Sequence, residues 1–279
     1  MRKSTLIVIA ATLLMAGCNS DLHYANSFIR KFEYQRPDAT ERIYVALPAT
    51  LLHTNSSVSN ISWFDYMPPA WQDSVIAAKT AILNRIDDSI FLAQFNGAFL
   101  FTLSRLQVPV ILVDDPAKLP PASDSVFTVH VAQLEAEEWL QPTRSDFYTR
   151  SGDYYYYDYE LRHFALHVWL RFDGADTLAP VFYHTGNIEE TFSGTVTNIH
   201  DRHAKLKTRF HRIDANDGYR MARRLGTECA TLYIERLLTE YVCRTKGTNG
   251  SYFYYNPGYN TIDRVLPYDE GIGESFQRL

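Results

Sequence analysis

The sequence predicts an α+β fold in which helices pack on one face of a mostly antiparallel sheet, forming a two-layer sandwich. Two segments, residues 126–139 and 159–172, alternate apolar and polar side chains, which is typical of strands with one solvated face. A turn at residues 173–176 follows the second segment and leads into a strand over residues 178–189, as in a hairpin. Helical spacing of apolar residues lies before and after these strands, so the two kinds of element are segregated along the chain.

The segment before the long strands is predicted to contain two strands and two helices. Residues 42–47 are largely apolar and end at Pro48, which cannot donate a backbone hydrogen bond to a sheet. Helical spacing begins at Trp71 and continues in a second helix over residues 88–106. Because this second helix is apolar over much of its circumference, we expect it between two layers. A buried strand is predicted over residues 108–113.

A long helix is predicted to close the sheet from the C-terminal side. It opens near residues 214–217 and ends at Gly247, where glycine supplies a left-handed conformation. Residues 193–213 are polar and basic with weak periodicity, so no regular element is expected there. One line of the helix is apolar and should face the sheet; it consists of Met221, Leu225, Cys229 and Leu232.

Composition indicates a folded chain and argues against nucleic acid as a partner. The chain has 279 residues, of which 46% are hydrophobic and 21% charged, enough to bury a substantial core. Lys and Arg number 27 against 32 Asp and Glu, and no stretch is dense enough in basic residues to bind nucleic acid. Cys229 and Cys243 lie about 21 Å apart on one predicted helix, too far for a disulfide, so both are expected to be free.

The N-terminus is typical of an export signal. Arg2 and Lys3 precede an apolar run that is too short to span a membrane. The residues Met15-Ala16-Gly17-Cys18 resemble the lipobox of bacterial lipoproteins, which implies that Cys18 carries a lipid and becomes the new N-terminus. Asp does not follow Cys18 directly, and by resemblance to lipoprotein sorting in enterobacteria this favours the outer membrane. Whether the body faces the periplasm or the cell surface stays open.

These observations predict four parts along the chain. They are a signal peptide over residues 1–17, a lipidated tether over 18–40, a single α+β domain over 41–247, and a Tyr- and Gly-rich tail over 248–279. The glycines of the tail are expected to prevent regular structure there.

The order of elements also resembles the auxiliary lipoproteins of ABC-type transport systems. The resemblance rests on the lipobox, IYVALP, a helix entered at Trp71, VFTVHVAQLEAEEW, FALHVWLRFDGAD and the helix GYRMARRLGTECATLYIERLLTEY, over about residues 42–243. It implies an accessory role in moving lipids across the envelope and other envelope proteins as partners. The second helix at 88–106 and the Tyr-rich tail depart from the pattern.

Two aromatic clusters are the candidate partner-binding residues. Large, rigid and amphipathic rings suit partner surfaces and stacking on sugars. The alternative is that the first cluster is an edge strand that packs its own rings and the second a tail folded onto the body. The clusters are Tyr154, Tyr155, Tyr156 and Tyr157, and Tyr252, Phe253, Tyr254 and Tyr255.

The acidic and histidine clusters are the candidate catalytic and metal sites. Glu135, Glu137 and Glu138 would suit a glycosidase only if two of them faced one cleft, yet alternation places Glu138 on the other side of the strand. His200, His203 and His211 lie among basic residues that oppose a divalent cation, and His163 and His167 lie about 13 Å apart on a strand. We therefore expect no metal, no cofactor and no catalytic residue.

The expected function is that of a non-catalytic, lipid-anchored envelope protein that docks to other envelope components. The membrane is a partner only through the N-terminal lipid. The alternative is a carbohydrate-binding or glycan-hydrolysing surface lipoprotein that uses the tyrosines and the acids of residues 135–138.

Overall fold

The computed structural model describes residues 21–30, 40–58, 63–148, 152–172, 181–199, 203–247, 251–266 and 277–278. The predicted signal peptide, the lipidation residue Cys18 and the predicted turn at 173–176 lie outside the described residues.

The described residues form strands and helices in the following order. The strands are β1 (Arg42–Ala46), β2 (Leu52–Asn55), β3 (Val110–Leu112), β4 (Val126–Tyr148), β5 (Tyr154–Arg171), β6 (Phe182–Glu189), β7 (Thr191–Ile199), β8 (His203–His211), β9 (Tyr252–Asn256), β10 (Thr261–Leu266) and β11 (Gln277–Arg278). The helices are α2 (Pro69–Lys79), α3 (Asp88–Leu103), α4 (Ala215–Lys246) and a helix over residues 21–30, with 3-10 turns η1 (Phe64–Tyr66), η2 (Leu83–Arg85), η3 (Ser104–Leu106) and η4 (Pro116–Lys118).

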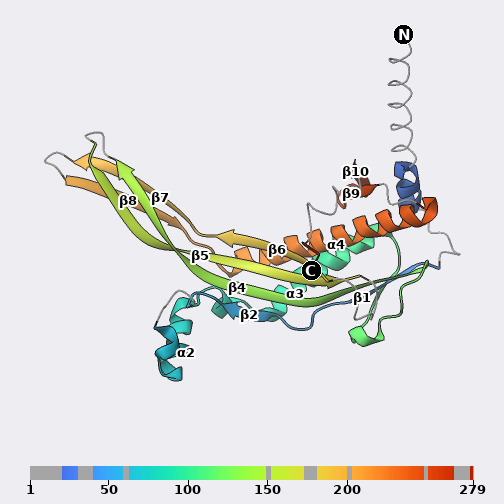
Figure 1. The fold of residues 1–279 in the computed structure, drawn as a ribbon, viewed down its shortest axis with the longest axis horizontal. Coiled ribbons are helices and arrows are strands. Elements are labelled where there is room, and N and C mark those ends of the chain that lie inside the picture. Colours follow the sequence, from blue (N-terminus) through green and yellow to red (C-terminus); the bar gives the residue numbers. More distant parts are fainter. Residues whose placement is uncertain are drawn as a thin grey trace, which may run out of the picture.

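The main sheet is a seven-stranded mixed sheet with the order β11-β6-β5-β4-β1-β3, in which β2 also pairs with β4. The antiparallel part, β4, β5, β6 and β11, includes the two longest strands. On the other side of β4, both β1 and β2 pair with it in parallel, and β3 is parallel to β1. The predicted α+β class is confirmed, with helices α3 and α4 on one face of the sheet (Figure 1).

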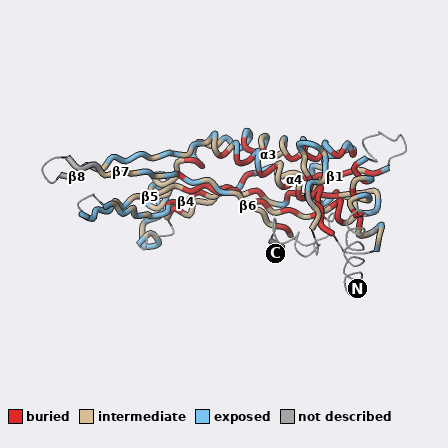
Figure 2. The backbone as a smooth tube through the Cα atoms, turned by 90° about the horizontal axis from the view of Figure 1, so that it is seen from above, coloured by how far each residue is buried: buried red, intermediate tan, exposed pale blue. Residues whose placement is uncertain are grey.

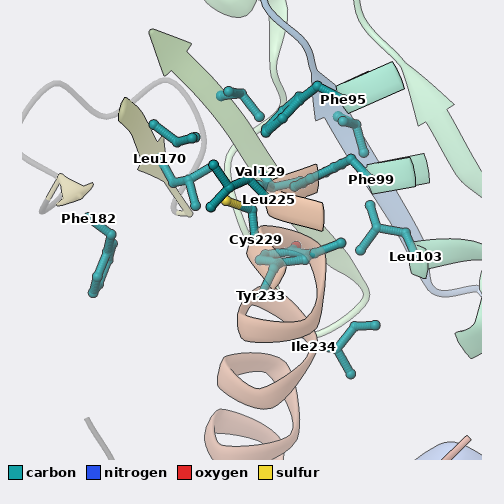
Figure 3. Packing of buried hydrophobic residues seen from close by; sticks show 14 of the residues in the cluster. Phe95, Phe99, Leu103, Val129, Leu170, Phe182, Leu225, Cys229, Tyr233 and Ile234 are labelled. Atoms are coloured by element: carbon teal, nitrogen blue, oxygen red, sulfur yellow. The ribbon is translucent and has the colours of Figure 1, made fainter. Parts of the chain in front are cut away.

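The core lies where α3 and α4 cover the sheet. Phe95, Phe99 and Leu103 of α3 meet Leu225 and Cys229 of α4 and the sheet beneath them (Figure 3). The buried stretches of backbone gather in this half of the molecule (Figure 2). The predicted apolar line of α4 is confirmed at its first three positions, whereas Leu232 is buried outside this main cluster.

Local sequence explains where the two core helices begin and end. Asp87 caps α3 by accepting hydrogen bonds from the backbone N–H groups of Ser89 and Ile90. Asp214 caps α4 in the same way, and the side chain of Asp217 accepts from the backbone N–H of Asp214, which completes a capping box. Gly247 ends α4 with a φ of 71°, as predicted.

Two predictions about burial are wrong, and helix α2 is more exposed than its apolar spacing indicates. Strand β3 is not buried, because it is the edge of the sheet and exposes Ile111 and Leu112. Helix α3 does not lie between two layers, since its outer side exposes Ile90 and Phe101. Helix α2 buries none of its residues, although its apolar spacing resembles that of a core helix.

The antiparallel strands form a long arm that projects from the body (Figure 1). Strands β4 and β5 stay paired from His130 opposite Arg171 to Tyr148 opposite Tyr154, well beyond the predicted strand ends at 139 and 159. The segment 193–213, for which no element was expected, instead contains most of the hairpin β7–β8. Its weak periodicity reflects its place in the arm, where little backbone is buried (Figure 2).

Both ends of the described chain pack on the body. Residues 21–30 of the predicted tether form a helix whose Phe28 ring lies 4.7 Å from the ring of Tyr241 on α4. The expectation that glycines prevent regular structure in the tail is wrong, because β9 and β10 form a hairpin that packs against α4.

Candidate functional site

One face of the arm carries an exposed group of aromatic and charged side chains, which we call the tyrosine face. Along β4 and β5, the side chains of every second cross-strand pair point to the same side of the arm. The rings of Tyr148 and Tyr154 lie 5.4 Å apart, and those of Tyr154 and Tyr156 lie 6.2 Å apart. All three rings are exposed. The tyrosine face consists of Arg144, Asp146, Tyr148, Tyr154, Tyr156 and Asp158.

Polar contacts hold the side chains of the tyrosine face in place. The guanidinium of Arg144 donates to both carboxylate oxygens of Asp158, at 2.6 and 3.1 Å, and lies 4.4 Å from the centre of the Tyr156 ring. The hydroxyl of Tyr154 donates to Asp146 at 2.7 Å. Such bidentate and stacked contacts fix orientation as well as distance. The rings therefore form a ladder with charged groups set beside it.

The same contacts fix the protonation states of the tyrosine face. The hydrogen bond from Arg144 lowers the pKa of Asp158, and the hydrogen bond to Asp158 raises the pKa of Arg144. The hydrogen bond to Asp146 raises the pKa of the Tyr154 hydroxyl. At neutral pH the face therefore presents a charged pair and a neutral phenol.

The opposite face of the arm is covered by the hairpin β7–β8. The ring of Phe192 lies 4.1 Å from that of Tyr159 and 5.6 Å from that of Tyr157, both in stacked geometry. Gly194 of β7 permits this approach, because a Cβ atom there would lie 2.6 Å from the ring of Phe147. Of the four tyrosines predicted in this run, Tyr154, Tyr155 and Tyr156 are exposed, whereas Tyr157 packs between the hairpins.

The second predicted cluster lies mostly inside the protein. Tyr252, Phe253 and Tyr255 are buried, and only Tyr254 is partly exposed. The Tyr252 hydroxyl and the Tyr255 backbone N–H donate to the two carboxylate oxygens of Glu235, each at 2.9 Å. Burial and the Glu235 carboxylate raise the pKa of Tyr252. In this conformation the three buried rings fasten β9 to α4 and cannot contact a partner.

The carboxylates of residues 135–138 divide between the two faces of the sheet, as predicted. On the face away from α3 and α4, Glu137 accepts from the Ser56 hydroxyl and lies 3.0 Å from Nε2 of His167. The Glu137 carboxylate thus lies between serine and imidazole, whereas a serine nucleophile needs the imidazole directly beside it. Glu135 accepts from the Thr54 hydroxyl. These contacts make a hydrogen-bonded network rather than a nucleophile with its base.

Glu138 has a structural role on the helix side. Its buried carboxylate accepts hydrogen bonds from the backbone N–H groups of Ala81, Ile82 and Leu83, at 2.8, 2.9 and 2.9 Å, and pairs with Arg162. Four donors satisfy a buried carboxylate and leave no oxygen free to activate water. Glu138 therefore anchors the segment after α2 to the sheet.

The histidines and cysteines of the described residues do not assemble a reactive centre. His200 lies outside the described residues, and within them no group of three or more His, Cys, Asp or Glu side chains could hold a metal ion. Cys229 and Cys243 are free thiols, as predicted. Burial raises the pKa of Cys229 well above its ordinary value, which keeps this thiol protonated and unreactive.

Comparison with known proteins assigns neither a family nor a function to this chain. No family model and no curated protein matches the chain. A solved structure described as a "putative neuraminyllactose-binding hemagglutinin homolog from Helicobacter pylori" matches with 9% sequence identity and a TM-score of 0.30, covering 77% of this chain and 94% of that one. At this level of similarity, the match assigns neither a fold family nor a ligand to this chain.

Sequence reasoning missed four of the six residues of the tyrosine face, namely Arg144, Asp146, Tyr148 and Asp158. Arg144, Asp146 and Tyr148 precede the tyrosine run and join it only because the β4–β5 pairing continues to the end of the arm. Alternation was the available signal, since Arg144, Asp146 and Tyr148 are spaced two apart, as are Tyr154, Tyr156 and Asp158.

Proposed function

We propose that this protein is a non-catalytic binding protein of the bacterial cell envelope and that the tyrosine face binds carbohydrate. The observation that carries the proposal is the exposed ladder of Tyr148, Tyr154 and Tyr156 with an oriented Arg144–Asp158 pair at its side.

The chemistry of the face suits a sugar. Tyrosine rings offer a flat apolar surface to the C–H groups of a pyranose and a hydroxyl at their edge. The carboxylate oxygens of Asp146 and Asp158 accept hydrogen bonds from sugar hydroxyls, and the Arg144 guanidinium donates to ring or carboxylate oxygens. Rings already held by neighbouring contacts lose little conformational freedom on binding.

The absence of catalysis belongs to the same proposal. A glycosidase needs two carboxyl groups facing one cleft across the scissile bond. Glu138 is buried on the helix side, while Glu135 and Glu137 are hydrogen-bonded to the hydroxyl groups of β2 and the residue after it. These contacts support binding over hydrolysis.

Anchoring remains part of the proposal as well. The lipobox residues before Cys18 support attachment to the outer membrane by an N-terminal lipid. Among the described residues, no helix is long and apolar enough to cross a bilayer. The projecting arm would then carry the tyrosine face away from the body (Figure 1).

A glycan array probed with the full chain in detergent tests the proposal. We expect a restricted set of glycans to be bound by the wild type and lost when Tyr148, Tyr154 and Tyr156 are all changed to Ala. Tyr259→Ala is the matched control, because Tyr259 is also an exposed tyrosine but lies in the β9–β10 turn. An array without binding, together with an envelope protein crosslinked to the wild-type arm but not to the triple variant, would favour protein docking instead. Release of sugar from any bound glycan would contradict the hypothesis that the protein is not an enzyme.

A further inference from the structure

The segment from η1 through α2 exposes more aromatic surface than a folded body normally leaves in water. Trp63, Tyr66 and Trp71 are 58, 88 and 66% exposed, and α2 buries none of its residues. Helix α2 projects from the body below the sheet in the view of Figure 1. We call residues 63–79 the aromatic knob. A concentration of exposed rings on one small element marks a surface that contacts something other than water.

The aromatic knob is internally braced. The side chain of Gln72 on α2 donates from Nε2 to the carbonyl oxygens of Phe64 and Met67, at 3.1 and 3.2 Å, which ties η1 to the helix. Pro69 stands at the first position of α2, where its fixed φ favours helix initiation. The exposed rings are therefore presented by a preformed element.

Within the part of the chain that the structure describes, the polar contacts between the knob and the body lie at the C-terminal end of the knob. Lys79 pairs with Glu160 of β5 at 3.1 Å, and the Arg162 guanidinium donates to the carbonyl oxygen of Lys79 at 2.7 Å. An isolated helix of 11 residues is marginal in water because nucleation is costly. Helix α2 has no buried side chain whose packing would offset the free energy of nucleation. A contact outside this chain would therefore stabilise the helix.

The charge of the knob limits the kind of surface that it can contact. The exposed part of the knob carries Asp65 and Asp73 and no Lys or Arg, because Lys79, its one cation, is paired with Glu160 at the base. An acidic knob is repelled by an anionic lipid surface and gains nothing from electrostatic attraction to it. Tryptophan and tyrosine are instead enriched where a bilayer meets water, with the ring in the apolar region and the polar group in the headgroups.

We propose that the aromatic knob inserts into the headgroup region of a zwitterionic phospholipid bilayer, with Trp63, Tyr66 and Trp71 as the inserted side chains. The 11-residue helix is too short to span and would lie at the interface. This contact is separate from the tyrosine face and from the N-terminal lipid, and it would give the body a second, weaker hold on a membrane.

Tryptophan quenching by brominated lipid tests the insertion. The chain has four tryptophans, at positions 63, 71, 139 and 169, and none in its first 18 residues, so a membrane-bound signal or lipid does not by itself produce quenching. The full chain is reconstituted with phosphatidylcholine vesicles brominated near the headgroup end of the acyl chains and with unbrominated vesicles. The comparison variant carries Trp63→Phe and Trp71→Phe, which remove two exposed reporters and leave Trp139 and Trp169 in the sheet.

We expect brominated vesicles to quench up to about half of the wild-type emission, because two of four reporters reach the interface, and to quench the double variant little. Equal quenching of the two chains would overturn the proposal, as would no quenching of either. Analytical ultracentrifugation without lipid adds an independent outcome. A wild-type dimer that becomes monomeric in the double variant, with no quenching in vesicles, would show that the rings meet a second copy of the chain and would overturn lipid insertion.

Discussion

Helix α3 packs closely on α4 at Gly226. A Cβ atom at Gly226 would lie 2.3 Å from the carbonyl oxygen of Phe95 and 3.2 Å from the Cβ of Ala98. The first contact is with backbone, which cannot rotate away, so Gly226→Ala must push the two helices apart. Overpacking of this kind costs about 1 to 3 kcal/mol, and we expect the upper part of that range.

The destabilisation caused by the clash must be separated from the effect of the substitution on helix propensity. Replacing glycine by alanine inside a helix stabilises it by about 1 kcal/mol, which partly offsets the clash at Gly226. Gly97 on α3 is the matched control, because a Cβ atom there meets nothing within 4 Å. Gly97→Ala should therefore stabilise the protein by about 0.5 to 1 kcal/mol.

Urea unfolding followed by circular dichroism measures both variants against the wild type. We expect the free energy of unfolding to differ between Gly97→Ala and Gly226→Ala by about 1 to 3 kcal/mol, with Gly226→Ala the less stable. Equal changes at the two positions would refute the close packing of α3 on α4.

Three further predictions each concern a single residue. Asp214→Ala should lower the thermal midpoint at pH 7, because capping hydrogen bonds from Asp217 and Asn216 lower the pKa of Asp214. That stabilisation is present above the ordinary value of 3.8 and is lost as the pH falls through the lower folded pKa, so the difference from wild type should disappear in acid. Tyr252→Phe should cost about 1 to 3 kcal/mol of unfolding free energy, since it removes a hydrogen bond to buried Glu235, and an unchanged urea midpoint would contradict the role of β9. Cys18→Ala should release the protein from isolated membranes or leave the precursor uncleaved, and unchanged processing with unchanged membrane association would refute lipidation.

Elements with a core face could be predicted from the sequence. Alternation in β4 and β5 and the apolar line through Met221, Leu225 and Cys229 both record burial against the other layer. The two ends of α4 could also be predicted from the sequence, because Asp214 and Gly247 act through local backbone geometry.

The remaining elements depend on contacts that periodicity does not encode. The hairpin β7–β8 gains its order from Phe192 stacking on Tyr159, a contact between segments more than 30 residues apart. Trp71 shows the reverse case, since its place in the apolar spacing of a helix does not reveal that its ring is exposed. Glycines in the tail suggested irregular structure, but Glu235 accepts hydrogen bonds from β9 and fixes the strand on α4.

The sequence also could not show which tyrosines of the run 154–157 are packed and which are exposed. Tyr156 and Tyr157 are neighbours in a run of four identical residues, and only the hairpin over one face distinguishes them. Alternation predicts that they face opposite ways, but it cannot say which side is covered.

Isothermal titration of a glycan selected on the array tests the central claim most directly. The wild-type chain, Tyr156→Ala and the control Tyr259→Ala are titrated under identical conditions. Loss of one stacked ring is expected to weaken binding about 10-fold, which corresponds to about 1.4 kcal/mol, in Tyr156→Ala only. Equal affinity of Tyr156→Ala and the wild type would contradict carbohydrate binding by the tyrosine face.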